Sequence, residues 1–142
     1  MRFASLSEKI LLLVCCLSIL SSSCRNAEVT AVRYGMVTGI KADKIGKYKV
    51  LHDSIWPGVV SKIQDCNIRN YSIYQKEIGG QYYLFSYFEY TGKDFKADMM
   101  KMAADSTTQL WWKETAPLQQ PLPEAALKNE TWTTMEEVFY LK

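Results

Sequence analysis

His52 is the only histidine of the chain, so it carries the only side chain whose ordinary pKa lies close to neutral pH. Tyr48 precedes it by four residues, and on a helix the phenol and the imidazole would lie about one turn apart on the same face. The adjacent pair Trp111-Trp112 is equally unusual, because neighbouring indoles on a helix point about 100° apart and at most one can face the core. The spacing alone predicts an aromatic-rich site around one titratable imidazole. Each of these features, taken separately, is also compatible with ordinary packing.

Charge and cysteine content argue against two kinds of site. The 142 residues include 17 Lys and Arg against 15 Asp and Glu, without the clustered basic surface that a nucleic-acid partner demands. Only Cys24 and Cys66 follow the apolar N-terminal segment, and a structural zinc site usually takes four Cys or His ligands. We therefore expect no nucleic-acid partner and no metal site.

The first 23 residues are predicted to be an export signal. Their apolar run, Ile10 to Leu20, is too short for a permanent span, which needs roughly 20 apolar residues. Basic residues precede the run and three serines follow it, which is typical of a secretory signal. Cys24 comes directly after the serines, in a pattern that resembles a bacterial lipoprotein processing site. Cleavage of an ordinary signal peptide nearby is the alternative.

On the lipoprotein interpretation, Cys24 is the lipidated first residue of the mature chain. Residues 24–30 then form a tether and residues 31–142 one folded domain. The protein would be an exported bacterial lipoprotein that faces the periplasm or is anchored to a membrane of the cell envelope, and its lipid would be its only contact with the membrane.

Residues 31–142 are predicted to fold in the order β-α-β-β-α-β. Alternating side chains indicate strands, helical spacing indicates helices, and Gly79-Gly80 indicates a hairpin turn. The strands are expected at 31–40, 70–75, 82–90 and 135–141, and the helices at 43–65 and 95–114. Pro57 should divide the first helix, and Asp105-Ser106-Thr107 the second. This order is the ferredoxin-like α+β fold, an antiparallel sheet with helices on one face.

Tyr82–Tyr90 is apolar on both faces of the expected strand. A sheet with one face in water usually alternates apolar and polar residues. We therefore expect the second face to be covered by a second copy of the chain or by the long C-terminal loop. A homodimer is the first choice.

Four sequence blocks follow one another along the chain: Tyr48-x-x-x-His52-x-x-Ile55-Trp56-Pro57, Asn70-Tyr71-Ser72-Ile73-Tyr74, Trp111-Trp112-Lys113 and Glu137-Val138-Phe139-Tyr140-Leu141. Together they resemble the L-rhamnose mutarotase family, in its order and at similar spacing. The resemblance implies a dimeric α/β barrel of ferredoxin-like subunits that interconverts the α and β anomers of L-rhamnose or a related free sugar. It implies His52 as the acid/base residue, with neither metal nor organic cofactor. The implied sugar contacts are Tyr48, Tyr71, Trp111 and Trp112.

The chain departs from the family pattern near the expected site. Asp53-Ser54 stands where the family often has Asn-Pro, and Gly58 stands where Glu commonly follows Trp-Pro. These departures leave the identity of the sugar open. Two other functions also stay open: a non-catalytic sugar-binding lipoprotein of the same fold, and a cofactor-free oxygenase of the dimeric α+β barrel type.

Overall fold

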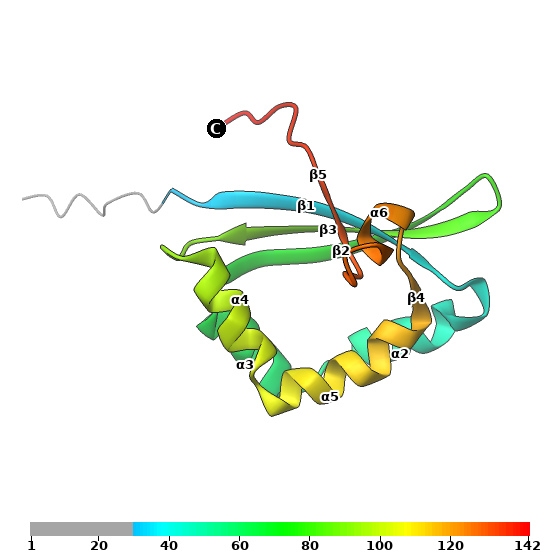
Figure 1. Cartoon of the computed structure of the whole chain (residues 1–142), viewed down its shortest axis with the longest axis horizontal. Helices are drawn as coiled ribbons and strands as arrows, with labels where there is room; N and C mark the ends of the chain where they lie inside the picture. The colour runs from blue at the N-terminus through cyan, green and yellow to red at the C-terminus, as the bar shows by residue number, and fades with distance from the viewer. Residues whose placement is uncertain (1–29) are drawn as a thin grey trace, which may run out of the picture.

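The computed structural model describes residues 30–142, in which helices cover one face of an antiparallel sheet (Figure 1). The export signal expected at residues 1–23, the lipidation site Cys24 and all but the last residue of the tether lie outside the described residues. The strands are β1 (Val32–Ile40), β2 (Ile68–Ile78), β3 (Gln81–Tyr90), β4 (Gln119–Gln120) and β5 (Thr133–Met135). The helices are α2 (Ile45–Asp53), α3 (Pro57–Asp65), α4 (Phe95–Ala103), α5 (Ser106–Thr115) and α6 (Pro123–Ala126), with the 3-10 turns η1 (Ala42–Lys44) and η2 (Ala116–Leu118). None of the helices in this part of the chain is long and apolar enough to cross a membrane.

The sheet has the strand order β2-β3-β1-β4, and β5 also pairs with β1. β1 and β3 are antiparallel over their whole length, from Val32 opposite Tyr90 to Ile40 opposite Tyr82. β2 and β3 form the predicted hairpin, whose turn places both Gly79 and Gly80 at positive φ, where a side chain would be strained. The predicted ferredoxin-like arrangement is confirmed.

Both predicted helix breaks are present. Trp56 is extended and Pro57 is the first residue of α3, where its missing N–H costs no helical hydrogen bond. Asp105 separates α4 from α5, and its carboxylate accepts hydrogen bonds from the backbone N–H and the hydroxyl of Thr108. The breaks let each helical stretch follow the curvature of the sheet.

The core lies between the helices and the sheet, in two clusters. One contains Ile40, Tyr48, Leu84 and Leu118; the other contains Cys66, Ile68, Phe88 and Met102. In β3 the buried residues alternate with half-buried ones, as expected for a strand with one face against helices. Because Tyr48 belongs to the first cluster, the candidate site is built directly on the core.

The last strand is shorter than predicted. β5 covers only Thr133–Met135, and residues 136–142 have no regular secondary structure, so the expected strand Met135–Leu141 is wrong in its extent. Its partner strand explains the difference: Met135 lies opposite Gly35, and β1 begins only three residues before that, at Val32. A strand of seven residues from Met135 would run past the end of β1.

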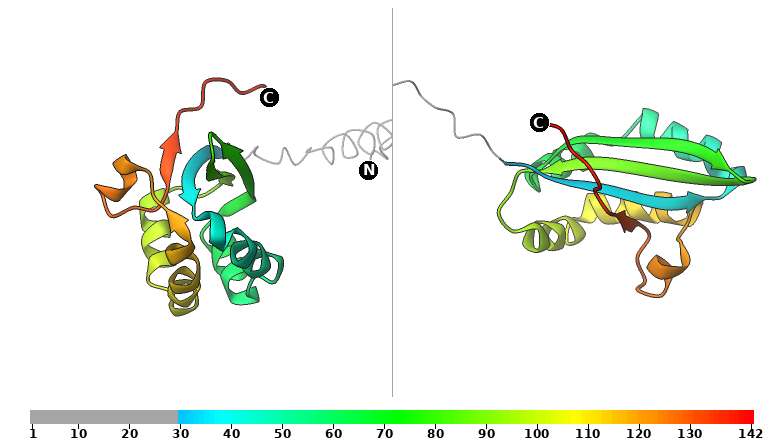
Figure 2. Two further views of the ribbon diagram at one scale, coloured as in Figure 1. Left: turned by 90° about the vertical axis from the view of Figure 1, so that its right-hand side faces the viewer. Right: turned by 90° about the horizontal axis from the view of Figure 1, so that it is seen from above.

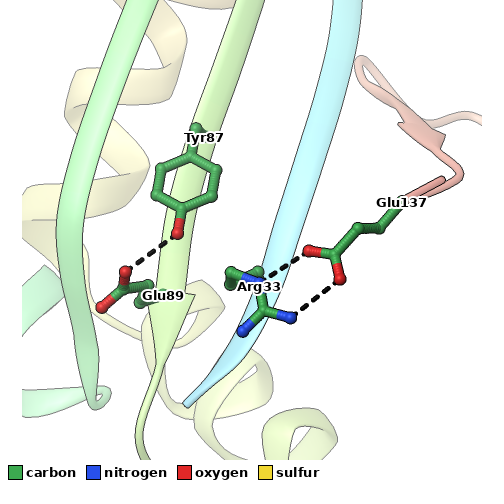
Figure 3. Close-up of polar contacts among 4 residues, drawn as sticks. All are labelled: Arg33, Tyr87, Glu89 and Glu137. Carbon is green, nitrogen blue, oxygen red and sulfur yellow. Dashed lines mark hydrogen bonds and ion pairs between the residues drawn. The ribbon is translucent and has the colours of Figure 1, made fainter. Parts of the chain in front are cut away.

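Side chains hold the C-terminal segment instead. The Arg33 guanidinium donates to both carboxylate oxygens of Glu137, at 2.6 and 2.8 Å (Figure 3). It also lies 3.4 Å from the centre of the Tyr140 ring. Beyond β5 the segment leaves on the side of the sheet opposite the helices (Figure 2). It therefore covers part of the face that the sequence predicted to be covered.

Candidate active site

A cavity of about 440 Å³ lies between α2 and the sheet. Its volume falls in the range of about 300–1,000 Å³ that is usual for small-molecule sites. Its lining combines apolar, aromatic and polar side chains. The lining residues are Ile40, Ile45, Tyr48, Lys49, His52, Asp53, Ile73, Tyr74, Gln75 and Leu84.

His52 lies in the last turn of α2 and lines this cavity half-buried. Its ring stacks on the Tyr48 ring, with centroids 4.1 Å apart, and meets the edge of Trp111 at 5.2 Å. Its Nδ1 lies 2.9 Å from the backbone carbonyl oxygen of Tyr48. Because a carbonyl only accepts hydrogen bonds, Nδ1 carries the proton and donates. The neutral ring then keeps a lone pair on Nε2, the nitrogen that this bond leaves open to a ligand.

Burial lowers the pKa of the His52 imidazole below its ordinary value. The bond to the Tyr48 carbonyl and the negative charge of Asp53 oppose this effect only in part. At neutral pH the ring is therefore mostly neutral and can accept a proton.

The two tyrosines near His52 stay protonated at neutral pH. Burial raises the pKa of the Tyr48 phenol far above its ordinary value, and the neighbouring Tyr71 adds to the shift. Within residues 30–142, the Tyr48 hydroxyl makes no hydrogen bond, which leaves it able to donate to a ligand. Burial also raises the pKa of Tyr71 to about 12, although 43% of that residue's surface is exposed. The Tyr71 ring packs edge-on against Phe88 at 5.6 Å.

The tryptophan pair divides between the core and the surface. Trp111 is only 6% exposed and sits between His52 and Trp56, whose ring centroid is 5.4 Å away. Trp112 is 39% exposed. The structure thus brings Tyr48, His52 and Trp111 together, with Tyr71 close to Tyr48, and places Trp112 outside this group.

Several cavity residues were missed by the sequence analysis. Lys49 and Asp53 flank His52 on α2, and Gln75 faces them from β2. A signal for Gln75 existed, since Tyr71, Ile73 and Gln75 share one face of an alternating strand. Among residues 30–142, no group of three His, Cys, Asp or Glu side chains could hold a metal ion.

Comparison with known proteins gives one consistent result. A family model described as L-rhamnose mutarotase matches residues 33–141. The L-rhamnose mutarotase of Bacillus subtilis is 31% identical over 109 residues, which cover 77% of this chain and 97% of the relative. That of Oceanobacillus iheyensis is 29% identical, over 77% of this chain and 97% of its own. The crystal structure of an L-rhamnose mutarotase from Formosa agariphila superposes with a TM-score of 0.58 at 23% identity, covering 78% of this chain and 99% of that one. Neither the binding-protein nor the oxygenase alternative is supported.

The same comparisons contradict the expected localisation. The match to the family begins at Arg33, and the Bacillus subtilis and Oceanobacillus iheyensis relatives are aligned over 97% of their own length. These relatives therefore consist of the domain, with nothing to correspond to an export signal and a lipidated cysteine. The prediction of an exported, lipid-anchored protein is wrong on this comparison.

Proposed function

The chain belongs to the L-rhamnose mutarotase family and is an isomerase that acts on sugars, and we propose that it interconverts the α and β anomers of L-rhamnose or a related free sugar with His52 as the acid/base residue. The observation that carries this proposal is the position of His52. Its ring lines a cavity large enough for a monosaccharide, and its Nδ1 is engaged by the Tyr48 carbonyl, so that Nε2 is left for the substrate.

The proton balance of the reaction suits a single imidazole. Neutral Nε2 takes the proton of the anomeric hydroxyl while the bond between C1 and the ring oxygen breaks, and the ring oxygen receives a proton. The open-chain aldehyde turns about its C1–C2 bond, and the reverse steps close the ring on the other face. Both oxygens are attached to C1, so the imidazolium formed in the first transfer can supply the second proton. A positioned acid/base group contributes typically about 10²–10⁴-fold, and proton transfer is all that this step requires.

Tyrosine hydroxyls assist as donors in this proposal. A phenol with a raised pKa remains a donor at neutral pH, and Tyr48 lines the cavity with its ring stacked on the imidazole. We place Tyr48 against the anomeric or ring oxygen, and the contact predicted for Tyr71, which does not line the cavity, stays a prediction. Trp111 supports the His52 ring through its edge contact, but it is buried and does not line the cavity, so the sugar contact predicted for it stays a prediction. The contact predicted for Trp112 stays a prediction.

The experiment is anomer exchange measured by saturation-transfer NMR on L-rhamnose, L-fucose, galactose and glucose. His52→Gln should lower exchange at least tenfold for the preferred sugar, because it removes the proton-transferring nitrogen. Val50→Ala is the matched control, since Val50 lies on the same helix and is 66% exposed. Equal exchange in the wild type and His52→Gln would remove His52 from the mechanism, and no exchange of any sugar by the wild type would refute the proposed activity.

We also propose that the protein is a homodimer formed through the sheet face opposite the helices. On β3, Tyr83, Phe85 and Tyr87 are half-buried on that face although no helix covers it. The C-terminal segment on the same side exposes 90% of Val138 and 78% of Phe139. Apolar area of this kind is typical of an interface between copies.

Sedimentation velocity tests the dimer. The wild type should sediment as a dimer and Phe85→Glu as a folded monomer, because the introduced charge would be buried in the interface. Met100→Glu, a change of a 65% exposed residue on α4, should leave the dimer intact. A wild type that is monomeric at micromolar concentration would contradict the proposal.

A further inference from the structure

Two charged side chains and one amide line the cavity without a role in the proton transfer described above. They are Lys49, Asp53 and Gln75. Within residues 30–142, none of these three side chains forms an ion pair or a hydrogen bond. A ligand can therefore bind them without first displacing a protein partner.

The three side chains approach the cavity from two sides. Lys49 and Asp53 are four residues apart on α2, so they share the helix face that also presents His52. Gln75 comes from β2, two residues after Ile73, which also lines the cavity. Together they provide a cationic donor, an anionic acceptor and an amide that does both. Sugar hydroxyls both donate and accept, which makes this set complementary to a polyol.

The charges also limit the class of ligand. Lys49 and Asp53 have opposite signs, so the set carries no net charge. A sugar acid would be attracted by Lys49 but repelled by Asp53, and an amino sugar would be attracted by Asp53 but repelled by Lys49, so neither sign of charge is favoured. A neutral sugar avoids both repulsions.

We propose that Lys49, Asp53 and Gln75 form a polar rim that binds the secondary hydroxyls of an uncharged pyranose whose C1 lies at His52, and that this rim determines which sugar is accepted. The inference rests on the proposed mutarotase activity and extends it to the recognition of the substrate. Asp53 accepts from one hydroxyl, and Lys49 and Gln75 donate to others. The apolar residues Ile40, Ile45 and Leu84 face the C–H groups.

Steady-state exchange kinetics test the rim. Asp53→Ala and Gln75→Ala should each raise KM about tenfold for the preferred sugar and change kcat less than about threefold, because the rim binds the hydroxyls without taking part in proton transfer. The assay is run at pH 8, where His52 is neutral whether or not Asp53 is charged. Asp65→Ala is the matched control, since Asp65 ends α3 as Asp53 ends α2, is also exposed, and is not part of the cavity. Asp53→Asn, which keeps an acceptor oxygen, should recover part of the lost affinity and serves if Asp53→Ala does not fold.

Deoxy analogues make the test specific. For the analogue that lacks the hydroxyl bound by Asp53, Asp53→Ala should no longer raise KM, whereas a merely structural effect would persist with every analogue. An unchanged KM in both alanine variants, or an equal rise with all analogues, would overturn the rim. If the wild type exchanges no sugar, the proposed activity is refuted. Binding of the same analogues, measured by tryptophan fluorescence, then still tests whether the polar rim binds sugar hydroxyls.

Discussion

Replacing Trp111 or Trp112 with alanine should have opposite outcomes, although the residues are adjacent on α5. Trp111 is 6% exposed and meets the rings of His52 and Trp56 edge-on at 5.2 and 5.4 Å. Truncation of a buried tryptophan typically costs about 3–5 kcal/mol, a figure that includes edge contacts of about 0.5–1.5 kcal/mol each. For a domain of this size such a loss corresponds to a fall in Tm of roughly 10–25 °C. Trp112 is 39% exposed, so its truncation should cost under about 1 kcal/mol.

Denaturant unfolding measures the two free energies of unfolding, and NMR exchange at a temperature where all variants are folded measures activity. Trp111→Ala should also lower anomer exchange, because the His52 ring loses one of the two rings that hold it. Trp111→Phe keeps a ring in place and should retain more of both stability and activity. Equal destabilisation by the two alanine variants, or an unaltered Tm for Trp111→Ala, would show that Trp111 does not hold His52 as the structure places it.

Three further predictions concern protonation, the hydroxyl donor and packing. Because burial lowers the His52 pKa, anomer exchange should stay constant at neutral pH and fall as pH drops below about 6.5 through the pKa of the folded protein. In that pH window the unfolded chain binds more protons than the folded chain, so the stability that His52 contributes at higher pH is lost on acidification. Thermal melts of His52→Gln should therefore show less of this loss than melts of the wild type. Tyr48→Phe keeps the stack at 4.1 Å and should fold normally while losing about tenfold or more in exchange, measured by NMR; unchanged exchange would exclude the hydroxyl as a donor. Gly39→Ala should lower Tm, because its Cβ would lie 2.5 Å from the Gln120 backbone oxygen. Gly46→Ala on α2 is the control: its Cβ meets nothing within 4 Å, so the change should be neutral or stabilising. A Gly39→Ala variant as stable as the wild type would contradict the close approach of β1 and β4.

The elements could be predicted where the signal is local. Pro57 lacks a backbone N–H, so it fits best in the first turn of a new helix, and this constraint does not depend on tertiary contacts. Gly79 and Gly80 tolerate positive φ, which fixes the hairpin and with it the pairing of β2 with β3. His52 and Tyr48 followed from the same kind of argument, since i and i+4 positions of a helix share a face.

What the sequence did not reveal depends on contacts between distant segments. How far β5 can extend is limited by where β1 begins, a hundred residues earlier in the chain, and no local pattern in Met135–Leu141 contains that information. Gln75 lines the cavity only because β2 and α2 lie on two sides of it. Which of the two tryptophans faces His52 depends likewise on how α5 is rotated against α2 and α3.

The helix break at Pro57 links the fold to the chemistry of His52. Because α2 ends at Asp53, His52 lies in its last turn, where unpaired carbonyl groups carry partial negative charge and favour the imidazolium. Burial favours the neutral ring, while the Tyr48 carbonyl and Asp53 oppose it. An acid/base group must hold a proton and release it within one turnover, so neither form should be strongly disfavoured. In a continuous helix His52 would keep the burial and lose the exposed carbonyls, and Trp56 would not extend back towards Trp111. Pro57, which separates α2 from α3, thus both orients Trp56 towards Trp111 and keeps the neutral and the protonated forms of His52 accessible.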